Sequence, residues 1–427
     1  MTTALSLVLF LVLMFLGMPV FLALGITALA LFVVTSEPLI GLATQILNDI
    51  NSSTLLAVPF FIMAAVFMEK GGIARALVEF AALWVGRVRG GLGVVCVVAC
   101  SMFAAICGSS VATAMAMGTV MLPPMLERGY DKRFVYGLIA ASGTLGILIP
   151  PSLPMVLFAI VADQSVPRLF LAGIVPGLLQ AVIFAIYSVI QGYRRGYPKE
   201  PLLGRREFLR VNIRALPSLG VPVVVALGIY GGLVTVSEAA ALSAIVALLV
   251  SILIYRGFGW LAVPEVVGSA LLSCSKIMMI IITALIFGHW MTKVGVSQAL
   301  VNLVVDSGLK PWQFLLAINV LLLLLGTFLD GAAMILIVVP LLVPVLKPIG
   351  IDPVHFAVIM TLNVEIALIS PPVGMNLFVL SSLRPGSMTD VNIGVLPFLV
   401  MLLGLLMVVT YVPELSLWLP NLVYGKG

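Results

Sequence analysis

Long apolar runs recur along this chain, with few polar positions between them. The run "INVLLLLLGTFL" at residues 318–329 is typical. Its apolar residues do not alternate with polar ones, as they would in the strands of a transmembrane barrel. A run of about 20 apolar residues crosses a bilayer as one helix. The pattern therefore predicts an all-α polytopic membrane protein with about nine to twelve crossings.

Two of the apolar runs are interrupted by paired prolines. They read "LGILIPPSLPM" at 145–155 and "IALISPPVGMN" at 366–376. A proline inside a helix costs about 3 kcal/mol or more, so each pair predicts an interrupted helix. The carbonyls freed at membrane depth need partners, which a cavity can supply by binding a cation there. One such pair alone indicates a structural kink, whereas two in the same form favour a binding site.

The two interruptions belong to an internal repeat. "MEKGGIARALV" at 68 matches "MTKVGVSQALV" at 291, and further along Pro123, Gly129 and Asp131 match Pro344, Gly350 and Asp352. The proline pairs follow at the same offset of 221 residues. We therefore expect two copies of one unit, at 55–161 and 278–382. The other parts are N-terminal scaffold helices at 1–54, connecting and scaffold helices at 162–277, and a C-terminal helix at 383–427.

Basic residues between the apolar runs predict the topology. Lys and Arg favour the cytoplasmic side, and they gather at 86–90, 127–133 and 192–214. Both ends of segment 91–126 then lie on one side, so it forms a re-entrant hairpin with its tip near 107–113. The matching hairpin, 311–346 with its tip near 328–333, is expected to enter from the opposite side. Seven Lys or Arg at 68–133 against three at 291–354 support inverted copies.

The overall composition agrees with a membrane protein. Hydrophobic residues make up 62% of the chain and charged residues 9%, where a soluble domain has about 25% charged residues. The net charge of +5 therefore indicates membrane topology, and we expect no nucleic acid partner. The first 34 residues are interpreted as a retained helix, not a cleaved signal. The four cysteines, Cys96, Cys100, Cys107 and Cys274, are expected to be small core residues.

Polar residues at the two hairpin tips are candidate ligands. The first tip offers Gly108, Ser109 and Ser110, and the second offers Gly326, Thr327, Asp330 and Gly331. A carboxylate between apolar runs, such as Asp330, is a functional hypothesis by default. Oxygen ligands without soft atoms suit Na⁺ or a proton. Glu365 is a second candidate, which could equally pair with a hydrogen-bond donor or face water.

Four motifs together resemble the large permease subunit of tripartite ATP-independent periplasmic (TRAP) transporters. They are "CGSSVATAMAMGTVMLPPM" at 107–125, "SGTLGILIPPSLPM" at 142–155, "LGTFLDGAAMILIVVPLLVP" at 325–344 and "NVEIALISPPVGMNLF" at 363–378. The resemblance covers nearly the whole chain. It implies a non-enzymatic, multi-pass protein of the bacterial inner membrane. It also implies Na⁺-coupled uptake of a carboxylate by an elevator motion.

The resemblance further implies partners and ligand positions. The expected partners are a periplasmic substrate-binding protein and a separate small four-helix membrane subunit, with two or more Na⁺ ions and no organic cofactor. Ala367 and Ser370 depart from the family pattern, in which glycine and threonine are usual. The implied sodium site 1 is Ser109, Ser110, Gly143 and Thr144; site 2 is Thr327, Asp330, Gly331 and Asn363; the substrate cavity is Gly108, Pro150, Pro151, Ser152, Pro371, Pro372, Gly374 and Asn376.

Three other functions were weighed. A stand-alone Na⁺- or H⁺-coupled carboxylate symporter would have a similar sequence and no need of a binding protein. An intramembrane protease is disfavoured, because "CGSSV" lacks a G-x-S-G nucleophile motif and "GTFLD" lacks the G-x-G-D spacing. An ATP-driven pump is disfavoured, because the chain has no phosphate-binding glycine loop with lysine.

Overall fold

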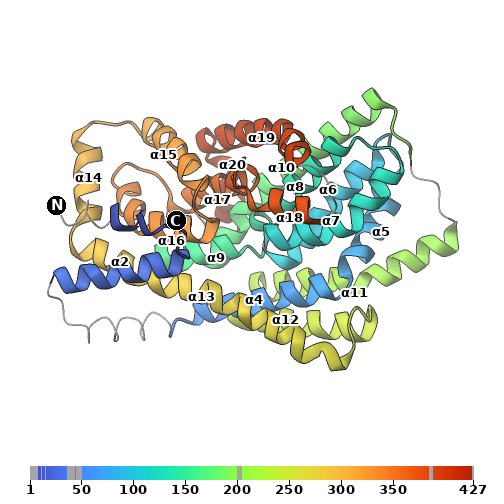
Figure 1. The fold of residues 1–427 in the computed structure, drawn as a ribbon, viewed down its shortest axis with the longest axis horizontal. Helices are drawn as coiled ribbons and strands as arrows, with labels where there is room; N and C mark the ends of the chain where they lie inside the picture. The colour runs from blue at the N-terminus through green and yellow to red at the C-terminus, as the bar shows by residue number, and fades with distance from the viewer. Residues whose placement is uncertain are drawn as a thin grey trace.

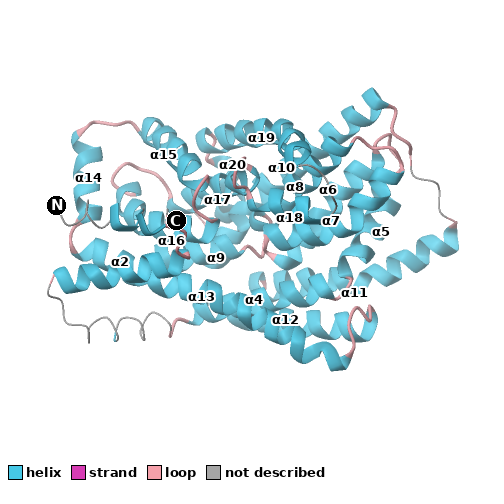
Figure 2. Ribbon diagram, in the orientation of Figure 1, coloured by secondary structure: helices cyan, strands magenta, loops and turns pink. Residues whose placement is uncertain are grey.

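A computed structural model describes residues 8–10, 12–14, 16–35, 44, 51–199, 204–383 and 388–425. Within these ranges the chain is helical throughout and contains no strand (Figures 1 and 2). The predicted all-α class is therefore confirmed. The four cysteines are free and buried, as expected of core residues.

The helices of the first half include two pairs that flank short non-helical links. One link, at 108–109, separates the two long helices of the first predicted hairpin, and the other, at 149–152, contains the first proline pair. The helices are α2 (Val20–Val34), α4 (Ser53–Lys70), α5 (Ile73–Val85), α6 (Gly91–Cys107), α7 (Ser110–Glu127), α8 (Lys132–Leu148), α9 (Leu153–Ala162), α10 (Val166–Arg195), α11 (Arg205–Tyr230) and α12 (Val236–Leu249).

The second half begins with a π-helical turn and a 3₁₀ turn, Val250–Ile254 and Trp260–Ala262. It continues with α13 (Val263–Lys293), α14 (Val296–Asp306), α15 (Pro311–Gly326), α16 (Gly331–Leu346), α17 (Pro353–Ile369), α18 (Met375–Leu383), α19 (Met388–Tyr411) and α20 (Glu414–Tyr424). The segment 383–427, for which one helix was predicted, thus holds two helices in its described part.

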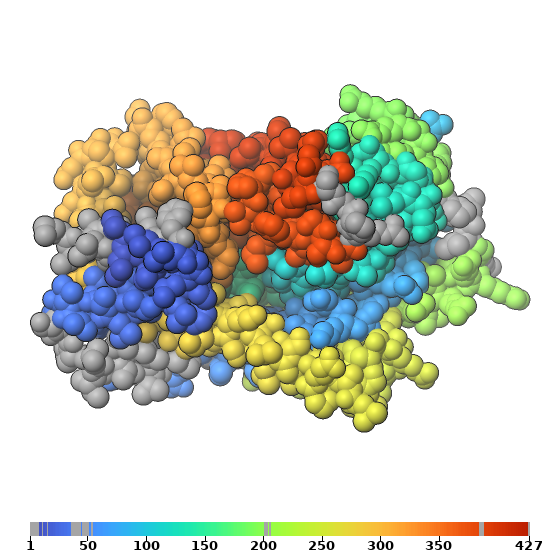
Figure 3. Space-filling view, in the orientation of Figure 1, coloured from blue at the N-terminus to red at the C-terminus, as the bar shows by residue number. Residues whose placement is uncertain are grey.

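The helices form a long row and a larger body above it. The row runs α2, α13, α4 and α12 along the lower edge of Figure 1, and each of these helices packs on the next. The body contains both predicted hairpins and both interrupted helices. On the face seen in Figure 3, the C-terminal helices (red) lie between the second hairpin (orange) and the α6–α8 region (teal).

The two matching stretches of sequence fold into the same succession of helices. α7 begins at Ser110 and α16 at Gly331, 221 residues later, and α8 and α17 each span 17 residues before their proline pair. Both proline–proline bonds are cis. The short helices α9 and α18 follow the breaks at the same offset. The helix boundaries thus follow the register in which the prolines and glycines of the two stretches align.

Fewer helices are long enough to cross a membrane than the sequence indicated. By length and composition the described part has six such helices, or seven if α4 and α5, which meet at a 72° bend, count as one span. Our expectation of about nine to twelve was too high. The hairpin arms α6, α15 and α16, and the interrupted helix α17, have only 16 or 17 residues each, so each is too short to count as a full span.

Both ends of the first hairpin lie beside the end of α10. Before α6, the Arg89 guanidinium stands 5.6 Å from the ring centre of Tyr193. After α7, Asp131 forms an ion pair of 2.7 Å with Arg195. Burial raises the pKa of Asp131, but the Phe134 N–H and the Arg195 guanidinium outweigh burial and hold it below its usual value. The hairpin therefore enters and leaves at the same end of the molecule.

The second hairpin opens at the other end of α10. A cavity of about 400 Å³ lies between Gln164 and Arg168, where α10 begins, and residues 347 and 350–354, which follow α16. α10 has 30 residues, and at 1.5 Å per residue its two ends are about 45 Å apart. The two hairpins are therefore attached near opposite ends of one long helix.

Cysteine labelling in a cysteine-free background tests this arrangement in the membrane. Val88→Cys and Glu127→Cys, both at exposed positions, are expected to react from the same, cytoplasmic, face. Lys347→Cys, also exposed, is expected to react from the opposite face. Labelling of positions 88 and 127 from different faces would exclude a re-entrant first hairpin.

Candidate functional site

The first hairpin tip lies directly against the first proline break. Gly108 has a left-handed φ of 63°, which favours glycine, and its carbonyl accepts a bond of 3.4 Å from Leu153 N. A Cβ at Gly108 would lie 2.6 Å from the Pro151 carbonyl oxygen. Ser109 Oγ begins α7 by accepting a bond of 3.4 Å from Ala112 N. The tip and the break thus fit together without room for a side chain between them.

Two glycines bring α8 equally close to the tip. A Cβ at Gly146 would lie 2.7 Å from the Ser109 carbonyl oxygen, and one at Gly143 would lie 2.9 Å from Ala114 Cβ. Beyond the break, Ser152 Oγ accepts a bond of 3.3 Å from Met155 N at the start of α9 and donates to the Ile147 carbonyl. The polar groups of the first break are therefore largely satisfied within the fold.

The second tip and the second break line a cavity of about 190 Å³. Asp330 begins α16, where its Oδ1 accepts bonds from Ala332 N at 2.7 Å and Ala333 N at 3.3 Å. Its Oδ2 accepts no hydrogen bond from the described residues. The cavity is lined by Gly326, Phe328, Leu329, Asp330 and Gly331 of the tip, Ala367, Leu368, Val373, Gly374 and Met375 around the break, and Val20 of α2.

The two breaks differ in exposure. Pro151 and Ser152 are buried, whereas Pro372 and Val373 are exposed. The second tip also approaches its helix closely, since a Cβ at Gly331 would overlap the Val364 side chain. In this conformation the first tip is closed onto its break, and the second retains a small space beside a carboxylate.

The two halves complete each other's sites. Asn376 of α18 donates from Nδ2 to Ser110 Oγ at 2.8 Å and to the Ala140 carbonyl at 3.0 Å. α18 therefore joins the first tip, and in the same way α9 packs on α16 of the second hairpin. Ser110 and Asn376, predicted for sodium site 1 and the substrate cavity, are thus brought into direct contact.

Thr144 points away from the first tip. Its Oγ1 donates to the Ala141 carbonyl at 2.8 Å and lies 3.3 Å from Glu365 Oε2 of α17. Gln180 of α10 donates to Thr144 Oγ1 at 3.0 Å. Of the two situations considered for Glu365, the structure has it paired with a hydrogen-bond donor, and its side chain is fully buried. A sodium-binding role for Thr144 stays a prediction.

Asn363 and Thr327 also make bonds other than to the second tip. Asn363 Nδ2 donates to Asn319 Oδ1 at 2.8 Å, and Asn319 Nδ2 donates to Thr410 Oγ1 at 3.0 Å. Thr327 Oγ1 donates to the Leu324 carbonyl at 2.7 Å. Asn319, Thr410 and Gln180 were missed from the sequence, although each stands as a lone polar residue in an apolar run.

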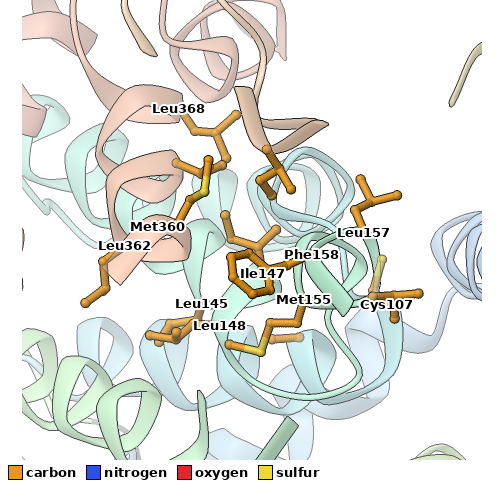
Figure 4. Packing of buried hydrophobic residues seen from close by; sticks show 14 of the residues in the cluster. Cys107, Leu145, Ile147, Leu148, Met155, Leu157, Phe158, Met360, Leu362 and Leu368 are labelled. Atoms are coloured by element: carbon orange, nitrogen blue, oxygen red, sulfur yellow. The ribbon is translucent and has the colours of Figure 1, made fainter. Parts of the chain in front are cut away.

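Apolar side chains enclose the interrupted helices. Figure 4 shows side chains of α8, α9 and α17 packed together around the first break. Phe158 of α9 and Phe356 of α17 have ring centres 6.3 Å apart. The polar groups between α8 and α17 are therefore shielded from water and lipid by residues such as Leu145, Leu148 and Leu362.

An all-helical membrane chain with two hairpin tips set against two interrupted helices has the architecture of a secondary transporter. The family model "Tripartite ATP-independent periplasmic transporter, DctM component" matches residues 7–415. The chain belongs to this family. It is a large permease component of a transporter, spans a membrane several times and is not an enzyme.

Curated relatives match over almost the whole chain. A C4-dicarboxylate TRAP transporter large permease protein DctM from Rhodobacter capsulatus is 40% identical, over 96% of this chain and 97% of that one. A sialic acid TRAP transporter large permease protein SiaM from Vibrio cholerae is 36% identical, over 97% of each.

Solved structures of more distant transporters share the fold. The YdaH transporter of Alcanivorax borkumensis has a TM-score of 0.63 at 14% identity, over 87% of this chain and 88% of that one. MtrF of Neisseria gonorrhoeae has a TM-score of 0.62 at 13% identity, over 87% and 83%.

Proposed function

We propose that this chain takes up an organic acid, a carboxylate, across the bacterial inner membrane in symport with Na⁺. A periplasmic substrate-binding protein delivers the substrate, and a separate small four-helix subunit accompanies the chain in the membrane. The relatives described above are named for C4-dicarboxylates and sialic acid, which are carboxylates, and this supports the substrate class.

The observation that carries the proposal is the cavity between the second tip and the second break. It brings the Asp330 carboxylate beside a break at which the α17 ladder ends. Oxygen ligands of this kind suit a hard cation such as Na⁺. The start of α16 and the helix after the break supply N–H groups and positive dipole ends, which suit the carboxylate of a substrate.

The packing supports an inverted repeat. α9 packs on α16 and α18 on α7, so each half gives the other the same element. Thr144 and Glu365, which contact each other, are themselves 221 residues apart. A residue that touches its own counterpart lies near a two-fold axis, because such an axis makes contacts reciprocal. With the hairpins attached near opposite ends of α10, this axis would lie in the membrane plane.

The arrangement also supports an elevator motion. Both tips and both breaks lie in one body, held together by contacts such as Asn376 to Ser110. The row of α2, α13, α4 and α12 packs along that body (Figure 1). The body would carry the substrate and ions, and helices of the row would serve as part of the scaffold.

Uptake into proteoliposomes tests the function. The chain, the small subunit and the binding protein are reconstituted, and the ligand that copurifies with the binding protein is identified by mass spectrometry and used as radiolabelled substrate. Uptake is expected to require both an inward Na⁺ gradient and the binding protein. Equal uptake with K⁺ in place of Na⁺ would disprove sodium coupling. Full uptake without the binding protein would instead establish the stand-alone symporter.

A further inference from the structure

Glu365 is a carboxyl group in the interior of the body, away from both hairpin tips. Its side chain, like those of Thr144 and Gln180, is completely buried. Glu365 Oε2 takes the bond from Thr144, while Glu365 Oε1 and Gln180 Oε1 have no hydrogen-bond partner. Two acceptor oxygens are therefore left unsatisfied in one small polar cluster.

The two unsatisfied oxygens lie close to each other. Both side chains reach Thr144 Oγ1, Gln180 from 3.0 Å and Glu365 from 3.3 Å. The Gln180 amide is also within hydrogen-bonding reach of the Glu365 carboxyl. Oxygen cannot bond to oxygen without a proton or a cation between them, and the donors present, one hydroxyl and one amide group, do not fill the gap.

No charged side chain is placed to neutralise Glu365. Among the described residues Glu365 forms no ion pair. Along its own helix the nearest ionisable group is His355, ten residues away, and this is about 15 Å at 1.5 Å per residue. His355 is bonded to Ser416 and the Thr410 carbonyl.

The helices packed against α17 place their charges equally far off. On α8 they precede Thr144 by eleven residues or more, and on α10 they are at least twelve residues from Gln180, which is about 16 Å or more in each case. α19 and α20 carry theirs in their first turns, and α9, α15, α16 and α18 have none. The charges are Lys132 and Arg133 on α8, Arg168, Arg194 and Arg195 on α10, Asp390 on α19 and Glu414 on α20.

We propose that Glu365 is a proton-binding site, with its carboxyl group protonated and donating from Oε1 to Gln180 Oε1. An ionised carboxylate without a partner at such a position costs several kcal/mol, whereas one proton removes the charge and satisfies both oxygens. The proton neutralises the contact between the two interrupted helices, which meet at Thr144 and Glu365. The site is separate from the proposed sodium sites at the tips.

Infrared difference spectroscopy of the purified full-length chain at neutral pH tests this site. The wild type minus Glu365→Gln spectrum is expected to contain the C=O band of one protonated carboxylic acid, present with Na⁺ or with K⁺ as the only cation. A carboxylate band in its place would overturn the proposal. If that band required Na⁺, Glu365 would be a cation ligand instead.

A second variant tests the proton's acceptor. Gln180→Met removes the oxygen that we assign to it, so the acid C=O band is expected to move to higher frequency. An unmoved band would contradict the bond to Gln180. Glu365→Gln keeps a donor at the same place and is expected to fold, and the Gln180→Met measurement decides the question if it does not. Neither readout depends on transport, so failure here is distinguishable from failure of the proposed function.

Discussion

Asp330→Asn in the reconstituted transporter is expected to raise the Na⁺ concentration for half-maximal uptake by about 10- to 100-fold. Interactions of a charged group contribute about 1.5–3 kcal/mol, and each 1.4 kcal/mol is a factor of ten. Asparagine caps a helix about as well as aspartate, so α16 keeps its first turn. The change therefore removes the charge beside the 190 Å³ cavity and little else.

Asp352→Asn is the matched control. Asp352 begins α17 as Asp330 begins α16, with Oδ1 accepting a bond of 2.7 Å from Val354 N, but it is not among the residues that line the tip cavity. Its sodium dependence is expected to equal that of the wild type. Equal sodium dependence in Asp330→Asn and the wild type would remove Asp330 from the ion site. A similar loss in both variants would assign the effect to capping.

Gly394→Ala is expected to cause a large loss of stability, about 3 kcal/mol at the upper end of what overpacking usually costs. A Cβ on Gly394 would overlap the Arg133 carbonyl oxygen and lie 2.8 Å from the carbonyl carbon. These are backbone atoms of α8 and cannot rotate away. The separation of α19 from α8 would have to increase, which the thermal unfolding midpoint of the purified chain measures.

Gly404→Ala on the same helix is the control for Gly394→Ala. Nothing lies within 4 Å of the Cβ that it would add, and alanine is a better helix former than glycine by about 1 kcal/mol. Its midpoint is expected to equal or exceed that of the wild type. If both variants unfolded at the same temperature, the close contact between α19 and α8 would be absent in the protein.

Helix breaks and tips could be located from sequence, because prolines and glycines act on the backbone where they stand. The second hairpin, predicted at 311–346, begins with Pro311 and ends with Leu346 in the structure. The second helix of the C-terminal segment was missed, although Pro413 precedes it. The number of full spans was overestimated, because half-length helices in hairpins are as apolar as whole ones.

Side-chain direction was harder to predict than position. Successive helical residues point about 100° apart, since one turn takes 3.6 residues. Gly143 therefore faces α7 while Thr144 faces α17 and α10. A motif places both residues at the tip site, but only the packing of the whole body tells which side chain faces which neighbour. Gln180, far along the chain from either tip, has no local signal that links it to Glu365.

The exchange of α9 and α18 between the halves has a consequence for biogenesis. A ribosome that has released only the first hairpin has made Ser110 but not Asn376, its partner in the finished protein. The first tip therefore enters the lipid incomplete and waits for a helix translated much later. Fragments cut in the linker between the halves should consequently regain a native tip only when both are produced in the same cell.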